Sequence, residues 1–73
     1  MKIGDTVQFM NNGHRFRGTI LKAILLDGTS TDKKDILCDT AVVLTVWVMP
    51  RQKEIPQRLF FVTPSKARVI KEF

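Results

Sequence analysis

The sequence predicts an all-β domain whose single sheet curls into a small barrel. The segment Thr40–Pro50 carries no charge and no glycine, is rich in β-branched residues, and ends at a proline, which cannot donate a hydrogen bond to a neighbouring strand; these features are typical of a strand. Turn signals, Asn12-Gly13 first among them, separate this segment from other short apolar stretches. Because 73 residues cannot cover both faces of a flat apolar sheet, a curled sheet is the economical arrangement.

The central segment is apolar on both of its faces. Side chains alternate along a strand, so each face is read from every second residue. One face carries Val42, Leu44, Val46 and Val48, and the other carries Ala41, Val43, Thr45, Trp47 and Met49. One face therefore covers the core, and the other must be covered by a neighbouring segment, by the curl of the sheet or by a partner.

The first two strands are expected to form a hairpin. The segment Thr6–Met10 alternates, with Val7 and Phe9 on one face, and the Asn-Gly turn follows it. The next segment, residues 15–26, is long for a strand, and Gly18 inside it indicates a bend or bulge. A helix over residues 20–26 is the alternative, but no N-cap precedes it, and Asp27-Gly28 follows it like a hairpin turn.

The rest of the chain is expected to alternate loops and short strands. Residues 27–39 are polar and are predicted to be mainly an exposed loop, and residues 50–56, bracketed by prolines, a second loop. Residues 57–62 form the fourth predicted strand and residues 68–73 the last. Between them, Thr63-Pro64 favours a single helical or 3₁₀ turn.

The two ends of the chain resemble a known fold family. The opening Gly4-Asp5-Thr6-Val7, followed by Gly18-Thr19-Ile20, resembles the "G-D-x-V … G-x-I" start of KOW and other SH3-like barrels. Residues 61–70 resemble the strand, helical turn and strand that end these barrels. The resemblance implies one domain over residues 1–73, a five-stranded SH3-like barrel with a short helical turn before its last strand.

Barrels of this shape bind nucleic acid, bind peptides or modified tails, or mainly oligomerise. The plasmid-borne dihydrofolate reductases of this shape share the Gly-Asp opening. Their active-site Gln-Ile-Tyr strand has no counterpart here, where Leu59-Phe60-Phe61 stands instead. The resemblance therefore implies a fold and does not carry over that activity.

Composition favours a polyanionic partner. Twelve Lys and Arg residues against seven Asp and Glu residues give a net charge of +5. Cys38 and His14 are single, so neither an internal disulfide nor a Cys/His zinc cluster can form. The start of the chain has no apolar signal core, and the unpaired cysteine fits a reducing compartment, so we expect a soluble cytoplasmic protein without a membrane partner.

Catalysis finds little support in the sequence. His14 follows an Asn-Gly turn, where exposure is expected, and no second histidine is present to activate a nucleophile. The loop carboxylates lack the spacing of a calcium loop and are opposed by two lysines; they are Asp27, Asp32, Asp35 and Asp39. We therefore expect no enzyme activity, no cofactor, no metal and no small-molecule substrate.

Nucleic-acid binding is the first functional hypothesis. Arg15 and Arg17 are expected on one face of the second strand, with Phe16 between them turned inward. The remaining predicted contacts are Arg51, Lys53 and Arg58, and Trp47 or Phe60 offers a ring on which a base could stack. These residues would form one cationic rim if the barrel closes.

A protein-interaction module is the alternative hypothesis. The apolar side chains exceed what one small barrel hides, and such a surplus marks interfaces. The predicted interface residues are Val43, Trp47, Met49 and Phe60. A homodimer, or an accessory or inhibitory factor docked on a larger protein, would bury them.

Overall fold

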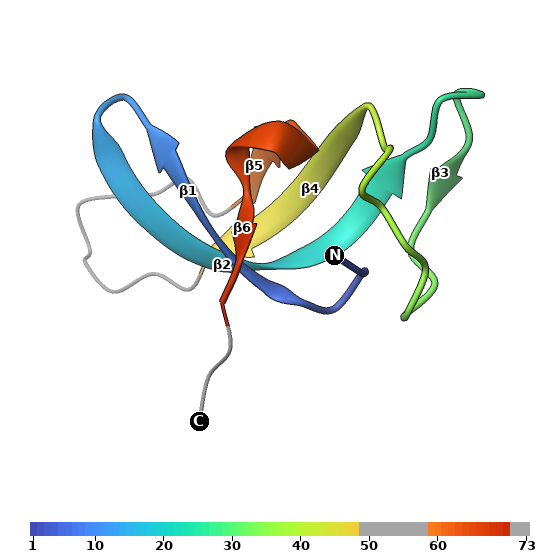
Figure 1. Cartoon of the computed structure of the whole chain (residues 1–73), viewed down its shortest axis with the longest axis horizontal. Coiled ribbons are helices and arrows are strands. Elements are labelled where there is room, and N and C mark those ends of the chain that lie inside the picture. Colours follow the sequence, from blue (N-terminus) through green and yellow to red (C-terminus); the bar gives the residue numbers. More distant parts are fainter. Residues whose placement is uncertain (49–58, 71–73) are drawn as a thin grey trace.

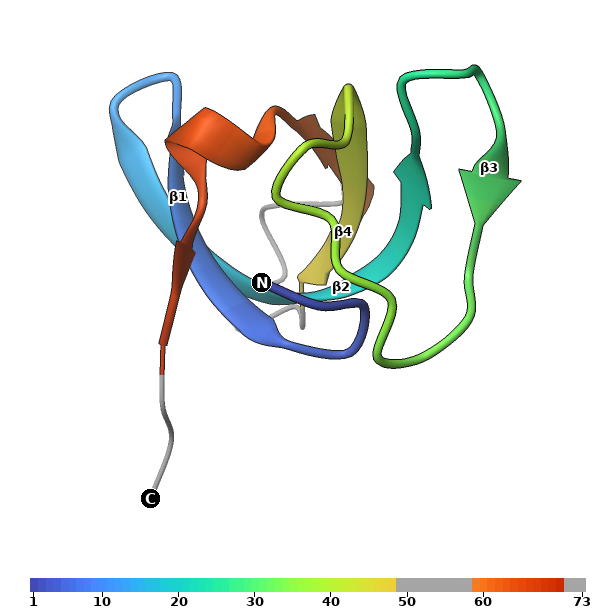
Figure 2. The same ribbon diagram turned by 45° about the vertical axis from the view of Figure 1, so that its right-hand side comes forward.

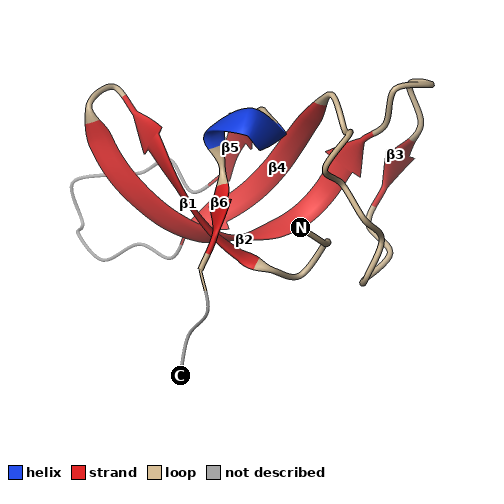
Figure 3. Cartoon of the chain, viewed as in Figure 1, coloured by secondary structure: helices blue, strands red, loops and turns tan. Residues whose placement is uncertain are grey.

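The computed structural model describes residues 1–48 and 59–70, and these fold as one antiparallel sheet (Figures 1 and 3). Its strands are β1 (Thr6–Asn11), β2 (His14–Ile24), β3 (Ser30–Thr31), β4 (Val43–Val48), β5 (Leu59–Val62) and β6 (Arg68–Val69). A 3₁₀ turn, η1 (Pro64–Lys66), lies between β5 and β6. The all-β prediction is confirmed, and so is the single turn before the last strand.

The sheet is strongly curled but does not close on itself among the described residues. Its strand order is β5-β4-β2-β1-β6, and β3 pairs with β2 beside this path. The long β2 bends across the molecule, so that it pairs with β1 near one end and with β3 near the other (Figure 1). The edge strands β5 and β6 are not paired with each other.

The predicted hairpin joins β1 and β2. Its register runs from Thr6 opposite Thr19 to Asn11 opposite His14. Asn12 and Gly13 have φ angles of 52° and 80°, the left-handed conformation that Asn-Gly adopts in a two-residue hairpin turn. The prediction of adjacent antiparallel strands is therefore confirmed.

Residues 20–24 continue β2 and do not form a helix. Strand β2 ends at Ile24, two residues before the predicted end at Leu26. The irregularity predicted at Gly18 lies instead between Ile20 and Lys22, where the register with β4 shifts. Gly18 serves another purpose, because a Cβ on it would lie 2.4 Å from the carbonyl oxygen of Trp47.

The polar segment 27–39 contains more structure than predicted. Asp27-Gly28 does form a tight turn, in which the N–H of Leu25 donates to the carbonyl of Thr29. This turn returns the chain as β3, which pairs with the end of β2. Sequence reading missed β3 because Ser30 and Thr31 alone show no alternating pattern.

The central strand is shorter than predicted. β4 begins at Val43, and the alternation that the sequence extended back to Thr40 breaks before it: Ala41 is buried and Val42 is 51% exposed. Within β4, Leu44 and Val46 are fully buried, while Val43, Thr45 and Trp47 on the other face are partly exposed. The prediction of one core face and one outer face therefore holds from Val43 onward.

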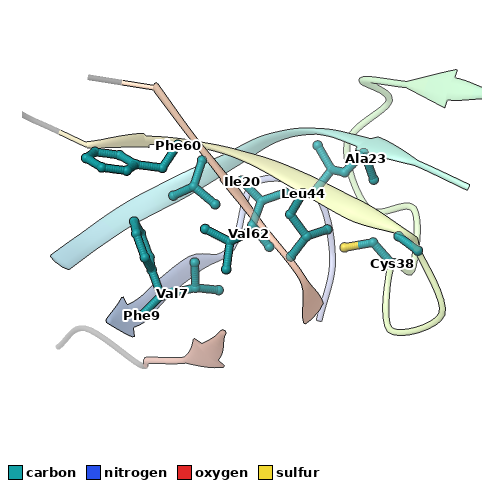
Figure 4. Packing of buried hydrophobic residues seen from close by; sticks show 11 residues of the cluster. Val7, Phe9, Ile20, Ala23, Cys38, Leu44, Phe60 and Val62 are labelled. Carbon is teal, nitrogen blue, oxygen red and sulfur yellow. The ribbon is translucent and has the colours of Figure 1, made fainter. Parts of the chain in front are cut away.

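The core lies inside the curl and is entirely apolar among the described residues (Figure 4). Its buried members are Ile3, Val7, Phe9, Ile20, Ala23, Cys38, Ala41, Leu44, Val46, Phe60 and Val62. At one end Phe9, Phe16 and Phe60 pack together, with ring centroids 4.8 to 5.7 Å apart. At the other end the cluster includes Cys38, which lies on the loop before β4 (Figure 4).

The beginning of the chain is held against the segment that contains Cys38. The N–H of Cys38 donates to the carbonyl of Met1, and the Met1 ammonium donates to Asp39 at 2.8 Å. An isolated bridge joins Lys2 to Leu37. In the part of the chain that the structure describes, no helix is long and apolar enough to cross a membrane.

Candidate functional site

One surface of the sheet combines an exposed ring, Phe61, and a partly exposed one, Trp47, with positive charge. It is formed by the side chains of β2, β4 and β5 that alternate with buried residues and so point away from the core. We call this surface the outer face. Its members are Arg15, Arg17, Thr19, Lys22, Ile24, Val43, Thr45, Trp47, Leu59 and Phe61.

Trp47 lies at the centre of the outer face. In the register of the sheet, Trp47 is opposite Thr19 of β2 on one side and opposite Leu59 of β5 on the other. Arg17 and Phe61 are therefore its diagonal neighbours, at the roughly 7–8 Å that such positions span. The indole of Trp47 thus lies between the guanidinium of Arg17, diagonal to it on β2, and the phenyl ring of Phe61, diagonal to it on β5 in the opposite direction.

Phe61 is the most exposed aromatic residue in the described part of the chain. Its side chain is 74% exposed, and that of its strand neighbour Leu59 is 46% exposed. Apolar side chains left in water at neighbouring positions are unfavourable unless something covers them. The two residues therefore mark β5 as the part of the outer face that a ligand would cover.

Charge is segregated between strands and loops. The strands carry Arg15, Arg17, Lys22 and Arg68 and no Asp or Glu, whereas all the described carboxylates lie in turns and loops. These carboxylates are Asp5, Asp27, Asp32, Asp35 and Asp39. A polyanion approaching the outer face therefore meets cations on the strand surface and no opposing carboxylate there.

The same segregation is visible along the length of the molecule. The turn of the β1–β2 hairpin lies at one end, β3 with its loops lies at the other, and η1 and β6 lie between them (Figures 1 and 2). The hairpin carries His14, Arg15 and Arg17, and η1 and β6 carry Lys66 and Arg68. The second end holds four of the five described aspartates, with Lys33 and Lys34 among them.

Three of the predicted nucleic-acid contacts lie together on this surface. Arg15 and Arg17 are exposed on one face of β2 with Phe16 turned inward, as expected, and Trp47 is diagonal to Arg17 on the same face. Arg17 also makes an interaction within the molecule. The remaining predicted contacts, Arg51, Lys53 and Arg58, lie outside the described residues, as does the predicted interface residue Met49.

Phe60 lies in the core and not on the outer face. Its side chain is 5% exposed, and its ring packs 4.8 Å from Phe16 and 5.4 Å from Phe9. The strand had appeared apolar on both faces, so the sequence did not distinguish Phe60 from Phe61. Of the other predicted interface residues, Val43 is partly exposed on the outer face beside Ile24.

Sequence reasoning missed two cations that the fold brings toward the others. Arg68 of β6 and Arg17 of β2 are both opposite Gln8 of β1, so the three residues form a row across the sheet. Lys66, at the end of η1, borders a hollow beside the last residues of β1. Neither position has a sequence signal of its own, because only strand pairing across the chain brings it there.

The single histidine and the single cysteine differ in their exposure to solvent. His14 is exposed at the start of β2. Cys38 is buried, and burial raises the pKa of its thiol above the ordinary 9.0. Among the described residues, no three His, Cys, Asp or Glu side chains are grouped as metal ligands would be.

In comparisons with known proteins, no family model, curated protein or solved structure matches this chain.

Proposed function

We propose that this protein is a small non-enzymatic binding module that holds single-stranded nucleic acid on its outer face. The observation that carries the proposal is the grouping of Trp47 and Phe61 with Arg15 and Arg17 on strand residues free of carboxylates. Exposed rings on a sheet surface stack bases, and flanking cations follow the phosphate backbone. A duplex offers no unstacked bases, so single strands fit this surface better.

We also propose that the curled sheet is an SH3-like barrel. The order β5-β4-β2-β1-β6, with a 3₁₀ turn between the last two strands in sequence, supports this fold. The Gly4-Asp5 opening has its expected place, because Gly4 has a φ of +100° and Asp5 precedes β1 directly. The fold supplies the surface, and the residues on that surface determine what it binds.

Fluorescence anisotropy with labelled thymidine and uridine homo-oligonucleotides tests the proposal. Phe61→Ala is expected to weaken binding by about 1–3 kcal/mol, the usual contribution of one stacked base. Leu37→Ala is the matched control, since Leu37 is 65% exposed but lies in the loop beyond β3. Because Trp47 is the only tryptophan, quenching of its fluorescence reports stacking directly.

The charge contribution is tested by repeating the titration over a salt series. Removing Arg15 and Arg17 together is expected to reduce the slope of log K against log salt by about 1.4, at roughly 0.7 per phosphate contact. The matched control replaces Lys33 and Lys34, a cationic pair at the opposite end of the molecule. Equal losses from both pairs, or no binding at low salt, would contradict the proposal.

A second candidate is a protein-interaction surface on the same face. The exposure of Leu59 and Phe61 on the edge strand β5 favours it, because Val43 of β4 and Ile24 of β2 continue this apolar band across the sheet. A homodimer or a larger protein could cover that band. Binding that hardly changes with salt, yet disappears in Phe61→Ala, would favour this candidate over nucleic acid.

A further inference from the structure

Among the described residues, a hollow of about 170 Å³ opens between strands that the sheet leaves unpaired. It is lined by the last residues of β1, by β5 and by the turn that follows: Phe9, Met10, Asn11, Phe60, Phe61, Val62, Thr63 and Lys66. Small-molecule sites usually enclose about 300–1,000 Å³. The hollow is therefore of a size for one or two side chains of a peptide.

One border of the hollow is an unpaired stretch of β1. The N–H of Ile70 donates to the carbonyl of Thr6 at 2.9 Å, so the backbone groups of Thr6 face β6. Backbone N–H and C=O groups alternate in direction from one residue of a strand to the next, so those of Gln8 and Met10 also face the β6 side of β1. Gln8 is paired with Arg68, but the position opposite Met10 would be Lys66, which belongs to η1. The backbone N–H and C=O of Met10 therefore have no ladder partner in β6.

The other border is the outer edge of β5. The N–H of Ile20, the residue after Thr19 in β2, donates to the carbonyl of Asp5 on the β1 side. Backbone groups alternate in direction along a strand, so those of Thr19 face β4. Thr19 is opposite Trp47, so by alternation Val46 faces β5, where it is opposite Phe60. Phe61, the next residue of β5, therefore directs its N–H and C=O away from β4, to the edge of the sheet.

Between these borders the floor of the hollow is aromatic. The rings of Phe9 and Phe60 lie beneath it with centroids 5.4 Å apart. This contact inside the core connects β1 to β5 without any backbone pairing between the two strands. The two unpaired edges are thus held near each other, with an apolar surface between them.

Charge decides which kind of segment fits. Lys66 lines the hollow, and Arg15 is opposite Met10 in the hairpin. No described carboxylate lies on β1, β5, η1 or β6. An acidic segment is attracted to this border, whereas a second copy of the chain, with a net charge of +5, is repelled.

We propose that an extended acidic peptide segment of a partner protein inserts between β1 and β5 as an added strand. Its backbone bonds to the free groups of Met10 and Phe61, and alternate side chains enter the hollow above Phe9 and Phe60. The side chains between them carry the carboxylates that meet Lys66 and Arg15. The added strand completes the curl of the sheet at its open place.

A capped hexapeptide of alternating Val and Glu is the probe, and NMR is the measurement. Binding is expected to shift the amide signals of Met10 and Phe61 and to slow their hydrogen exchange. Two control peptides separate the contributions. One carries Lys in place of Glu, and the other is N-methylated on alternate residues, which removes the donors of one edge. Both are expected to bind at least about tenfold more weakly.

Matched variants test the same contacts from the protein side. Met10→Ala and Met10→Pro both remove the Met side chain, but only proline removes the backbone N–H. Met10→Pro is expected to bind the Val/Glu peptide about tenfold more weakly than Met10→Ala. Lys66→Glu is expected to weaken binding by a similar factor and leaves every strand residue in place. The Met10→Ala and Lys66→Glu results keep the test decisive if Met10→Pro fails to fold.

Three outcomes overturn the proposal. The first is equal binding of the N-methylated and parent peptides, which would mean that no backbone pairing is involved. The second is equal binding of the Lys and Glu peptides, which would mean that charge does not select the segment. The third is protection of the Met10 and Phe61 amides without peptide, either as protein concentration rises or when an oligonucleotide is added, which would mean that the edge accepts a second copy or nucleic acid.

Discussion

Gly18 lies where two strands approach too closely for a side chain. A Cβ at this position would be 2.4 Å from the carbonyl oxygen of Trp47 and 2.7 Å from a methyl group of Val46. The first of these atoms belongs to the backbone of β4 and cannot rotate away. Any residue larger than glycine would therefore push β4 from β2 beneath the outer face.

Gly18→Ala is accordingly expected to lower the free energy of unfolding by about 1–3 kcal/mol, as overpacking does. Urea denaturation measures it, and Thr19→Ala, the neighbouring outward position, is the control. The variant is also expected to alter the Trp47 fluorescence of the folded protein, because the indole is attached to the displaced strand. A variant as stable as the wild type would mean that β4 moves without resistance.

A second prediction at the residue scale concerns alkaline pH. The hydrogen bond to Asp39 raises the pKa of the Met1 ammonium above its ordinary 8.0, and burial raises the pKa of Cys38 above 9.0. Both groups bind protons more tightly in the folded state. Their contribution to stability is full below the unfolded pKa values and is lost as pH rises through the folded ones.

Urea denaturation at neutral and alkaline pH is therefore expected to give a free energy of unfolding that declines above about pH 8. Asp39→Asn, which removes the charge that attracts the ammonium, is expected to make the decline shallower. The native thiol is also expected to react slowly with a thiol reagent until the protein unfolds. A stability that increases with pH in this range would contradict the reasoning.

At the scale of elements, the strands differ in how firmly they are held. β2 and β4 are paired on both sides, whereas β3 and β6 have two residues each and one partner. The isoleucines Ile20 and Ile70 offer a matched comparison. The N–H of Ile20 donates to Asp5 at 3.0 Å from a central strand, and that of Ile70 donates to Thr6 at 2.9 Å beside β6.

Native-state hydrogen exchange is expected to be at least about tenfold faster at Ile70 than at Ile20, because the edge opens without the rest of the sheet. The residue types are the same and the bond lengths nearly so, which leaves the position in the sheet as the main difference. Equal exchange rates would indicate that the whole sheet opens as one unit.

At the scale of the whole molecule, the curl of the sheet divides its surfaces by function. The inner face is filled by an apolar core, and the outer face combines Trp47 and Phe61 with cations. The open border between β1 and β5 adjoins this face and adds Lys66 and the unpaired backbone groups of Met10. The two proposals share Arg15 and Phe61, so the Met10 and Lys66 variants are the ones that test the peptide proposal by itself.

Much of the fold could be predicted because its signals are local. Asn12-Gly13 specifies a hairpin turn through the φ angles that these residues tolerate, and Thr63-Pro64 favours the start of η1 in a similar way. The alternation of the strand placed Leu44 and Val46 on one face of β4 and Val43 and Trp47 on the other, as the structure has them. Each of these signals depends on residues a few positions apart.

The candidate site was predicted less completely. Arg15, Arg17 and Trp47 could be identified from strand alternation and residue type. Phe60 and Phe61 could not be distinguished, because a strand apolar on both sides reads the same in either register. Phe60 is buried against Phe9 and Phe16 of the β1–β2 hairpin, and this contact depends on the tertiary structure.

The sequence by itself determined that this chain forms strands, where its tight turns lie and that its surface is basic, since these follow from backbone preferences and charge. Only the tertiary structure decided which phenylalanine of β5 is exposed and that Arg68 lies across Gln8 from Arg17. It also decided that, among the described residues, β1 and β5 remain unpaired beside Lys66. The physical reason is that strand pairing joins residues far apart in the chain, and no local pattern encodes its register.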